Sequence, residues 1–509
     1  MAWLAGLHIV LTPSLLFAMV IGSSIGLFLG TLPGLGPGFA LTLFVPLTFD
    51  LSTAVALTFL VAMYTAAVFG GAISAVLINV PGHPGNIATT FDGYPMAQQG
   101  RAGEAIAAIG VAGAVGGIIS VIGLVFIAPL VTDIAVKINP ADYFMLAVFG
   151  LAMVSATAGK DVIQGILLGG LGFALSTVGQ DPITGFYRFT YGSSYLKSDG
   201  INFAVMVVGL FAIGSAFLMI EQRHLPREYE YVRISNDFWI GVKRVLQNPW
   251  QVLRASIVGV IMGVIPGLGI AISNIAAYIV ESKINPRKKW GKGEVVGVMA
   301  PEAADNATLV AELIPAFTLG IPGAITSALM LDAITVHGLQ PGPSFFHGNN
   351  PTIAAFFIAM FLSQIVFAVL GIALSKFFAK GAEIPLSILA PIIIVMGCVG
   401  AYAIHGNIGD IALALMFGVI GYIILKLHLP LAPIVLGAIL GPLAEDNYRR
   451  ALLIQHATHK SIFLAPLPLV LIVLSLAVFF IPLVFQMRSR FHRDSSQLAE
   501  SLSTKEEED

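Results

Sequence analysis

The chain has 509 residues, of which 57% are hydrophobic and 11% charged, with a formal net charge of -2. Soluble domains carry about 25% charged residues, so this composition, with a mean hydropathy of +0.89, excludes a water-soluble globular protein. The single cysteine, Cys398, excludes an intrachain disulfide scaffold, and the near-neutral charge does not favour nucleic-acid binding. We therefore expect an all-α polytopic membrane protein.

Apolar stretches of about the length needed to cross the hydrocarbon core follow one another along the chain. In the first half they are 54–80, 104–129, 143–158, 161–179 and 202–220. In the second half they are 294–320, 352–375, 385–404, 409–427, 430–443 and 464–486. Two further apolar stretches, 10–49 and 251–281, are each interrupted by Pro-Gly-Leu-Gly. The pattern predicts about 10–12 transmembrane segments, with re-entrant or broken helices among them.

The positions of Lys and Arg predict the orientation, because cytoplasmic loops retain basic residues. No Lys or Arg precedes Arg101, whereas the segments 221–250 and 282–293 hold five each. We place both segments and Arg101 in the cytoplasm, and the neutral turn around Asp50 outside. The expected organisation, segment by segment, is a first transmembrane repeat at 1–220, a cytoplasmic linker at 221–250, a second repeat at 251–460, a terminal transmembrane helix at 461–487 and a polar tail at 488–509.

The two halves share two motifs in the same order. Residues 26–36 match residues 259–269 at three Gly, one Pro, one Leu and a final Gly, an offset of 233, and Pro81-Gly82 matches Pro322-Gly323 at an offset of 241. The basic and neutral loops exchange places between the halves, which predicts inverted-topology repeats. Such repeats with Gly/Pro-broken helices are typical of secondary transporters. For the outer glycines of the first motif, close helix packing of the Gly-x-x-x-Gly kind is an equal alternative.

The broken segments supply the candidate substrate site. Breaks at membrane depth persist where they line a cavity or are buried against protein, and a helix beginning after a Pro-Gly loop directs free N–H groups at an anion. Neither Pro-Gly loop contains Lys or Arg, so neutral donors would hold the substrate. His83 either takes up a proton with the substrate or only forms hydrogen bonds. The predicted substrate-binding residues are Pro33, Gly34, Gly36, Pro81, Gly82, Asn86, Thr89, Thr90, Pro266, Gly267, Gly269, Gly320, Pro322, Gly323 and Thr326.

Acidic residues within apolar segments supply the candidate ion site, because ionisable groups at membrane depth are costly. Four such residues lie in the second half: Glu302, Asp305, Glu312 and Asp332. We assign ion coupling to Glu302, Asp305 and Asn306, with a Na⁺ site at Glu302 and Asn306, since carboxylate and amide oxygens suit a hard cation. The alternatives are that the same carboxylate carries a proton, or that the acids only cap a helix.

Several motifs together resemble the TctA family, the large membrane subunit of bacterial tripartite tricarboxylate transporters. They are Gly-Thr-Leu-Pro-Gly-Leu-Gly at 30–36, Pro-Gly-His-Pro at 81–84, Thr-Thr-Phe-Asp-Gly-Tyr-Pro-Met at 89–96, Gly-Lys-Gly-Glu at 291–294, Pro-Glu-Ala-Ala-Asp-Asn-Ala at 301–307, Leu-Gly-Ile-Pro-Gly at 319–323 and His-Gly-Leu-Gln-Pro-Gly-Pro at 337–343. The chain departs from the family pattern at Asp305, where Asn is expected, at 308–312, which is usually Gly-rich, and at Asp332.

The resemblance implies Na⁺- or H⁺-driven symport of di- or tricarboxylates across the bacterial inner membrane. It also implies a small TctB-like membrane subunit, a periplasmic TctC-like solute-binding protein and an elevator-like motion. An uncoupled organic-anion channel or facilitator is the alternative. An intramembrane enzyme is not favoured, because the sequence has no His-Glu-x-x-His motif, and we expect no cofactor other than the coupling ion.

Overall fold

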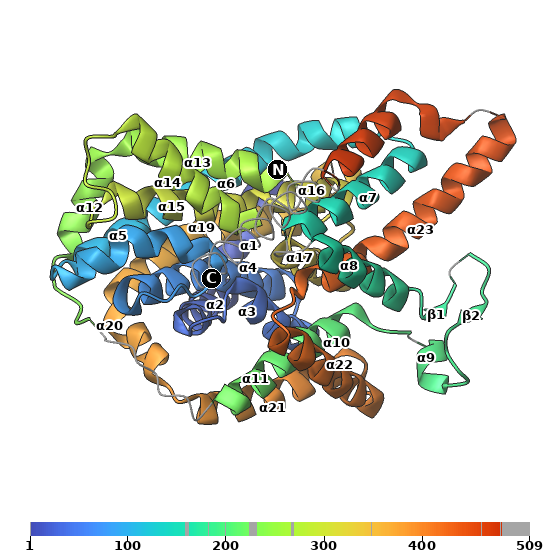
Figure 1. The fold of residues 1–509 in the computed structure, drawn as a ribbon, viewed down its shortest axis with the longest axis horizontal. Coiled ribbons are helices and arrows are strands. Elements are labelled where there is room, and N and C mark those ends of the chain that lie inside the picture. The colour runs from blue at the N-terminus through green and yellow to red at the C-terminus, as the bar shows by residue number, and fades with distance from the viewer. Residues whose placement is uncertain are drawn as a thin grey trace, which may run out of the picture. The chain divides into compact units, whose positions relative to one another are not determined.

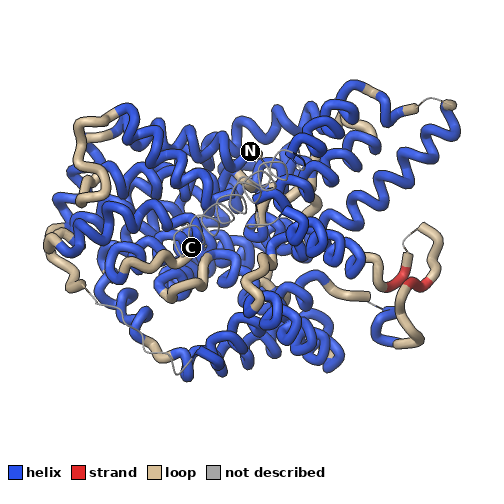
Figure 2. The backbone as a smooth tube through the Cα atoms, viewed as in Figure 1, coloured by secondary structure: helices blue, strands red, loops and turns tan. Residues whose placement is uncertain are grey.

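The computed structural model describes residues 2–157, 162–181, 183–198, 200–222, 232–265, 269–347, 349–459, 461–478 and 480. Within these ranges nearly all regular structure is helical, and the single two-stranded hairpin pairs Gly179 with Arg188 and Gln180 with Tyr187 (Figure 2). Seven described helices are long and apolar enough to cross a membrane, and five more apolar helices are shorter. The predicted all-α polytopic membrane fold is confirmed, and the number of crossings stays a prediction.

The elements follow in chain order (Figure 1). The first half contains α1 (Ala2–Val10), α2 (Pro13–Thr31), α3 (Pro37–Phe44), α4 (Thr53–Ile78), α5 (Ile87–Gln98), α6 (Ala102–Ala135), α7 (Pro140–Thr157), α8 (Val162–Ser176), β1 (Gly179–Gln180), β2 (Tyr187–Arg188), α9 (Ser194–Ser198), α10 (Phe203–Val207) and α11 (Gly214–Gln222). A π-helical turn, Val208–Ile213, joins α10 to α11 without a break.

The second half contains α12 (Phe238–Gln247), α13 (Pro249–Val264), α14 (Gly269–Ile284), α15 (Val296–Ala311), α16 (Leu313–Leu319), α17 (Ile325–Val336), α18 (Pro343–His347), α19 (Pro351–Ala373), α20 (Ser375–Phe378), α21 (Leu386–His405), α22 (Ile408–Lys426) and α23 (Ala432–Thr458). Short 3-10 turns occur at Pro46–Thr48, Pro84–Asn86, Ala379–Glu383 and Ile462–Leu464. Of the predicted terminal segments, 479, 481–487 and the tail 488–509 lie outside the described residues, as do 223–231 of the linker.

The apolar stretches predict the helices closely, with one difference at α23. The stretch 430–443 is only the first part of this helix, which continues to Thr458. Charged residues ended the apolar pattern, but within the helix Arg449 pairs with Glu445 one turn earlier, and such i,i+4 pairs support helix on a polar surface.

The duplication is visible in the packing of the two halves. α2 lies on α4 at Gly30, whose hydrogen faces the Ala67 carbonyl, and α13 lies on α15 at Gly263, whose hydrogen faces the Thr308 carbonyl. The glycines one turn earlier repeat both contacts. Gly30 and Gly263 are 233 residues apart, while Ala67 and Thr308 are 241 apart, so both sequence offsets reappear as one spatial arrangement. Close packing of the outer glycines, the alternative stated above, therefore holds.

The described residues group into two compact units, 1–137 with 178–431, and 138–177 with 432–509. Within the second unit, the hairpin of α7 and α8 packs with α23. Within the first unit, the hairpin of α21 and α22 packs with α10 and α11. Each three-helix group thus combines a hairpin from one half of the chain with a single helix from the other half.

The segments predicted to be cytoplasmic lie together in the first unit. The Arg101 guanidinium donates to the Gly293 carbonyl at 3.0 Å, which joins its loop to the basic segment 282–293. Arg244, at the end of the linker, lies 3.4 Å from Glu104. Three segments assigned to one side by their charge are therefore neighbours, and the identity of that side stays a prediction.

The neutral turn around Asp50 has its own partner. His337 Nε2 lies 3.0 Å from the Thr48 carbonyl oxygen, and the Thr53 hydroxyl donates to the His337 carbonyl at 3.2 Å. The loop after α17, which also lacks Lys and Arg, thus lies beside the corresponding neutral turn of the first half.

Asp92 on α5 joins the halves near the basic segments. Its Oδ1 accepts the Gly293 and Glu294 amides at 2.9 and 2.8 Å, and its Oδ2 accepts the Tyr278 hydroxyl at 2.9 Å. Asp92 therefore anchors the loop before α15 as well as its own helix.

Candidate functional site

The centre of the candidate site is a pair of buried carboxylates on α15. Glu302 and Asp305 are each 0% exposed, and their spacing of three residues places them on one face of the helix. The Asn86 amide of the first Pro-Gly loop donates to both, at 3.0 Å to Glu302 Oε1 and 3.3 Å to Asp305 Oδ2. The Thr89 hydroxyl also donates to Glu302 Oε1. Acids of the second half are thus bound by donors of the first half.

His83 completes this cluster and has a defined tautomer. Its Nδ1 accepts the Gly85 amide at 3.1 Å, so Nδ1 carries no proton and the neutral ring has its proton on Nε2. Nε2 lies 3.3 Å from Asp305 Oδ2. Of the two roles considered for His83, the geometry matches the hydrogen-bonding one.

The first Pro-Gly loop is fixed by backbone contacts. Asn79 ends α4 in the left-handed conformation, with φ of 56°, and the chain then turns into Pro81-Gly82. The Gly82 amide donates to the Gly71 carbonyl at 3.2 Å, and a Cβ on Gly82 would lie 2.6 Å from the Gly30 carbonyl oxygen. Gly is required here because two helices approach the loop, and the Gly82 amide is already occupied.

Four oxygens of the cluster have no hydrogen-bond partner among the described residues, although all are buried. They are Asn86 Oδ1, Glu302 Oε2, Asp305 Oδ1 and Asn306 Oδ1. Each such buried group costs about 1–3 kcal/mol when unpaired. Carboxylate and amide oxygens are hard ligands, so the donor set fits an alkali cation or a proton. Within the described ranges no group of three His, Cys, Asp or Glu side chains is arranged to hold a metal ion, which leaves amide oxygens an essential share of any cation shell.

Asn306 is held by its own helix. Its Nδ2 donates to the Glu302 carbonyl at 3.1 Å, and α6 approaches so closely that a Cβ on Gly113 would lie 2.6 Å from the same nitrogen. The side chain is therefore fixed with its amide nitrogen engaged and its oxygen unpaired.

The first Pro-Gly-Leu-Gly hairpin lies against the same loop. Pro33 and Gly34 form the turn between α2 and α3, with Gly34 exposed and at φ of 80°. Gly36 packs on His83, where an added Cβ would lie 2.6 Å from the His83 Cβ. The hairpin and the Pro-Gly loop of the first half are thus in contact, as the prediction of a shared site requires.

In the second hairpin, Gly269 begins α14 with φ of 60°, while Pro266 and Gly267 lie outside the described residues. One turn into α14, Asn274 donates to the Gly85 carbonyl and, at 3.2 Å, to the Pro84 carbonyl. The helix that follows the second hairpin therefore supports the first Pro-Gly loop.

The second Pro-Gly loop binds a different acid. Gly320 ends α16 at φ of 70°, Pro322 and Gly323 are buried, and the Thr326 hydroxyl at the start of α17 donates to Glu312. Gly38 of α3 contacts this loop, and a Cβ there would lie 3.6 Å from Thr326 Cγ2. α3 thus supports the second loop as α14 supports the first.

Two predicted residues lie apart from the carboxylates. The Thr90 hydroxyl donates to the Ile87 carbonyl of its own helix at 2.7 Å, and Pro81 is half-buried in the turn after α4. Asp332 on α17 has an oxygen without a partner among the described residues, but it does not contact Glu302 or Asp305 through any hydrogen bond in that part of the chain.

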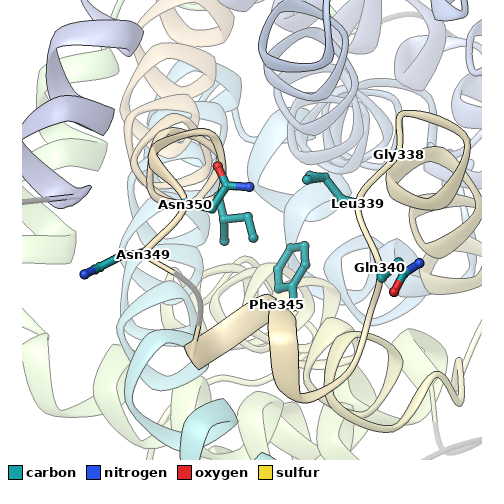
Figure 3. A pocket seen from close by; sticks show the side chains of 7 residues that line it. Gly338, Leu339, Gln340, Phe345, Asn349 and Asn350 are labelled. Carbon is teal, nitrogen blue, oxygen red and sulfur yellow. The ribbon is translucent and has the colours of Figure 1, made fainter.

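A cavity of about 410 Å³ lies near the end of α17 and is separate from the carboxylate cluster. Figure 3 shows its lining side chains, which come from the loop after α17, from α18 and from the start of α19. The lining residues are Gly338, Leu339, Gln340, Phe345, Asn349, Asn350 and Ile353. None of the predicted site residues lines it, and the acid cluster itself is closed to solvent.

The sequence analysis missed Tyr64 and Asn274. Tyr64 contacts Glu312 from α4, and Asn274 supports the first loop. Both are polar residues in apolar helices, and Tyr64 is 241 residues before Asp305, so applying the repeat offset to Asp305 would have identified it.

Comparison with known proteins agrees with this geometry. Residues 16–436 match the model of the tripartite tricarboxylate transporter TctA family. An uncharacterised 52.8 kDa protein in the TAR-I ttuC' 3' region of Agrobacterium vitis is 32% identical over 486 residues, 95% of this chain and 96% of that protein. A second protein, from the TAR-II ttuC' 3' region, is 31% identical over 234 residues, 46% of this chain and 96% of its own length. No solved structure matches the chain. The broken helices, the paired loops and the family match over most of the sequence establish that the chain belongs to the tripartite tricarboxylate transporter TctA family.

Proposed function

We propose that the chain is the large transmembrane subunit of a binding-protein-dependent secondary transporter that takes up di- or tricarboxylates by Na⁺ or H⁺ symport. It would act in the bacterial inner membrane with a small TctB-like membrane subunit and a periplasmic TctC-like solute-binding protein. Membership of a transporter family, which is not an enzyme class, supports the transport role. The observation that carries the coupling is the buried pair Glu302 and Asp305 with its unpaired oxygens.

The proposed coupling ion binds at Glu302, Asp305 and Asn306, with Asn86 as a further ligand. Coupling then follows from electrostatics. Two unit charges about 4 Å apart interact by about 4 kcal/mol at an effective dielectric constant of 20, so an empty acid pair repels a carboxylate substrate from the adjacent loops. A bound cation removes this repulsion, and by linkage the bound substrate strengthens cation binding by the same factor.

The proposed substrate contacts are the backbone and neutral donors of the broken segments, at the residues predicted from the sequence. Asn86 and Thr89 already donate to the carboxylates. They therefore connect the two sites: when the acids bind a cation, these donors are released toward the substrate. A substrate held without Lys or Arg leaves readily on the cytoplasmic side, as uptake requires.

Uptake into proteoliposomes tests the proposal. Labelled citrate, other di- and tricarboxylates and aromatic acids would be offered with candidate binding proteins under imposed Na⁺ or H⁺ gradients. Accumulation of a carboxylate that stops when the gradient is collapsed supports symport. Flux that is unaffected by collapse of both gradients indicates the uncoupled facilitator, and no flux with any partner refutes the transport role.

A further inference from the structure

A second buried acid, Glu312, lies at the junction of α15 and α16 and is 2% exposed. Its Oε1 lies 2.8 Å from the Tyr64 hydroxyl oxygen and accepts a hydrogen bond from Thr326. The same Tyr64 oxygen lies 2.6 Å from the Leu309 carbonyl oxygen. Two hydroxyl groups therefore take part in three close oxygen–oxygen contacts.

The hydrogens of this group can be counted. A hydroxyl carries one hydrogen and a carbonyl carries none, so the Leu309 contact uses the Tyr64 hydrogen, and the Thr326 contact uses the Thr326 hydrogen. The contact between Tyr64 and Glu312 then has no hydrogen left unless the carboxyl supplies it. With a proton on Glu312 Oε1, the carboxyl donates to Tyr64, Tyr64 donates to Leu309, and every contact is satisfied.

We propose that Glu312 is a proton-binding site, distinct from the Glu302–Asp305 cation site, and that it is protonated in the conformation described here. This site deepens the proposed function, on which its role in transport rests, because it would let a proton accompany the substrate in addition to the cation. Its proton would leave when α4 and α17 move relative to α15.

The repeat explains why this site occurs in the second half. Tyr64 precedes Asp305 by 241 residues, and each contacts the Pro-Gly loop of the opposite half: Asp305 approaches Asn86, and Tyr64 forms a hydrogen bond with an acid that holds Thr326. The residue that corresponds to Glu312 is Gly71, where an added Cβ would lie 3.1 Å from the His83 ring. The first half therefore has space only for a loop, while the second half places a carboxyl there.

The surroundings of Glu312 permit both charge states. Among the described residues, the titratable side chains that act on it are Tyr64 from α4 and Asp305 from α15, and neither is basic. At the start of α17, the Ser327 amide and the Thr326 hydroxyl face the carboxyl. A helix N-terminus stabilises an anion, so the α17 end would hold Glu312 after its proton leaves.

Infrared spectroscopy of the full-length protein in lipid at neutral pH tests the protonation directly. The carbonyl stretching band of a protonated carboxylic acid should be present in the wild type and reduced in Glu312→Gln. The matched control is Glu281→Gln, because Glu281 is equally buried but pairs with Arg254 at 2.8 Å, and its removal should leave the band unchanged. A band of equal intensity in wild type and Glu312→Gln overturns the proposal.

Two further measurements keep the proposal testable. If Glu312→Gln does not fold, Tyr64→Phe should shift the acid band because the carboxyl loses its acceptor, and an unshifted band overturns the proposal. In proteoliposomes with the binding protein and citrate as the probe, Glu312→Gln should retain citrate exchange but lose one proton per citrate. An unchanged proton count contradicts the site. Failure of the wild type to move any carboxylate refutes the proposed function and leaves the infrared result standing.

Discussion

Replacing Gly263 by Ala tests the packing on which the repeat comparison depends. A Cβ at this position would lie 2.6 Å from the Thr308 carbonyl oxygen and 2.7 Å from the Ala311 Cβ. Ordinary contacts of a Cβ begin at 3.4 Å, so α13 and α15 must separate by 3.4 minus 2.6, or about 0.8 Å. Helices in membranes associate through van der Waals packing of small residues, and a gap of this size loses a quarter to a half of each affected contact.

The expected loss is about 1–3 kcal/mol, the usual cost of overpacking a close contact. Gly30→Ala, the corresponding change in the first half, should cost more, because the Ala67 carbonyl is closer still. Gly38→Ala is the matched control: its Cβ would lie 3.6 Å from the nearest atom, and Ala gains at most about 1 kcal/mol in a helix.

Melting temperatures of the purified variants in detergent, together with the fraction that elutes as monodisperse protein, measure this order. We expect Gly30→Ala to melt lowest, Gly263→Ala next, and Gly38→Ala at or above the wild type. Equal melting temperatures for Gly263→Ala and Gly38→Ala would refute the close approach of α13 and α15.

Two further predictions concern the ties between the halves. Asp92→Ala should lower the melting temperature more than Tyr278→Phe, because it leaves two buried amides unpaired at about 1–3 kcal/mol each, and equal effects would contradict that role. Asn86→Leu should raise the cation concentration for half-maximal uptake about tenfold or more, since a hydrogen bond to a charged group contributes about 1.5–3 kcal/mol. Thr90→Val, whose hydroxyl bonds only within its helix, should leave that concentration unchanged, and similar shifts in both would remove Asn86 from the ion site.

The sequence predicts the helices well because each apolar stretch is a local signal. The bounds of α4 and α19 differ from the predicted 54–80 and 352–375 by only one or two residues. The breaks are equally local, since Pro and Gly mark them. A helix that continues past its apolar part, as α23 does, leaves no such mark.

The site is predicted only in part, because periodicity within a segment does not identify its neighbours. Nothing near His83 in the sequence indicates that it lies beside Asp305, 222 residues later. The repeat supplies the missing information: its two offsets relate helix pairs across the chain, and Tyr64 could have been found from Asp305 in this way. The swapped three-helix groups could not, since no motif marks α7, α8 or α23.

The central claim is that the acid pair on α15 couples cation movement to carboxylate uptake, and Glu302→Gln tests it most directly. The variant keeps the volume of the side chain and removes its charge. Uptake of the transported carboxylate would be measured in proteoliposomes with the binding protein, with the gradient imposed and collapsed. We predict that Glu302→Gln abolishes gradient-driven accumulation while substrate still binds to the solute-binding protein. Accumulation with an unchanged ion dependence would contradict the account.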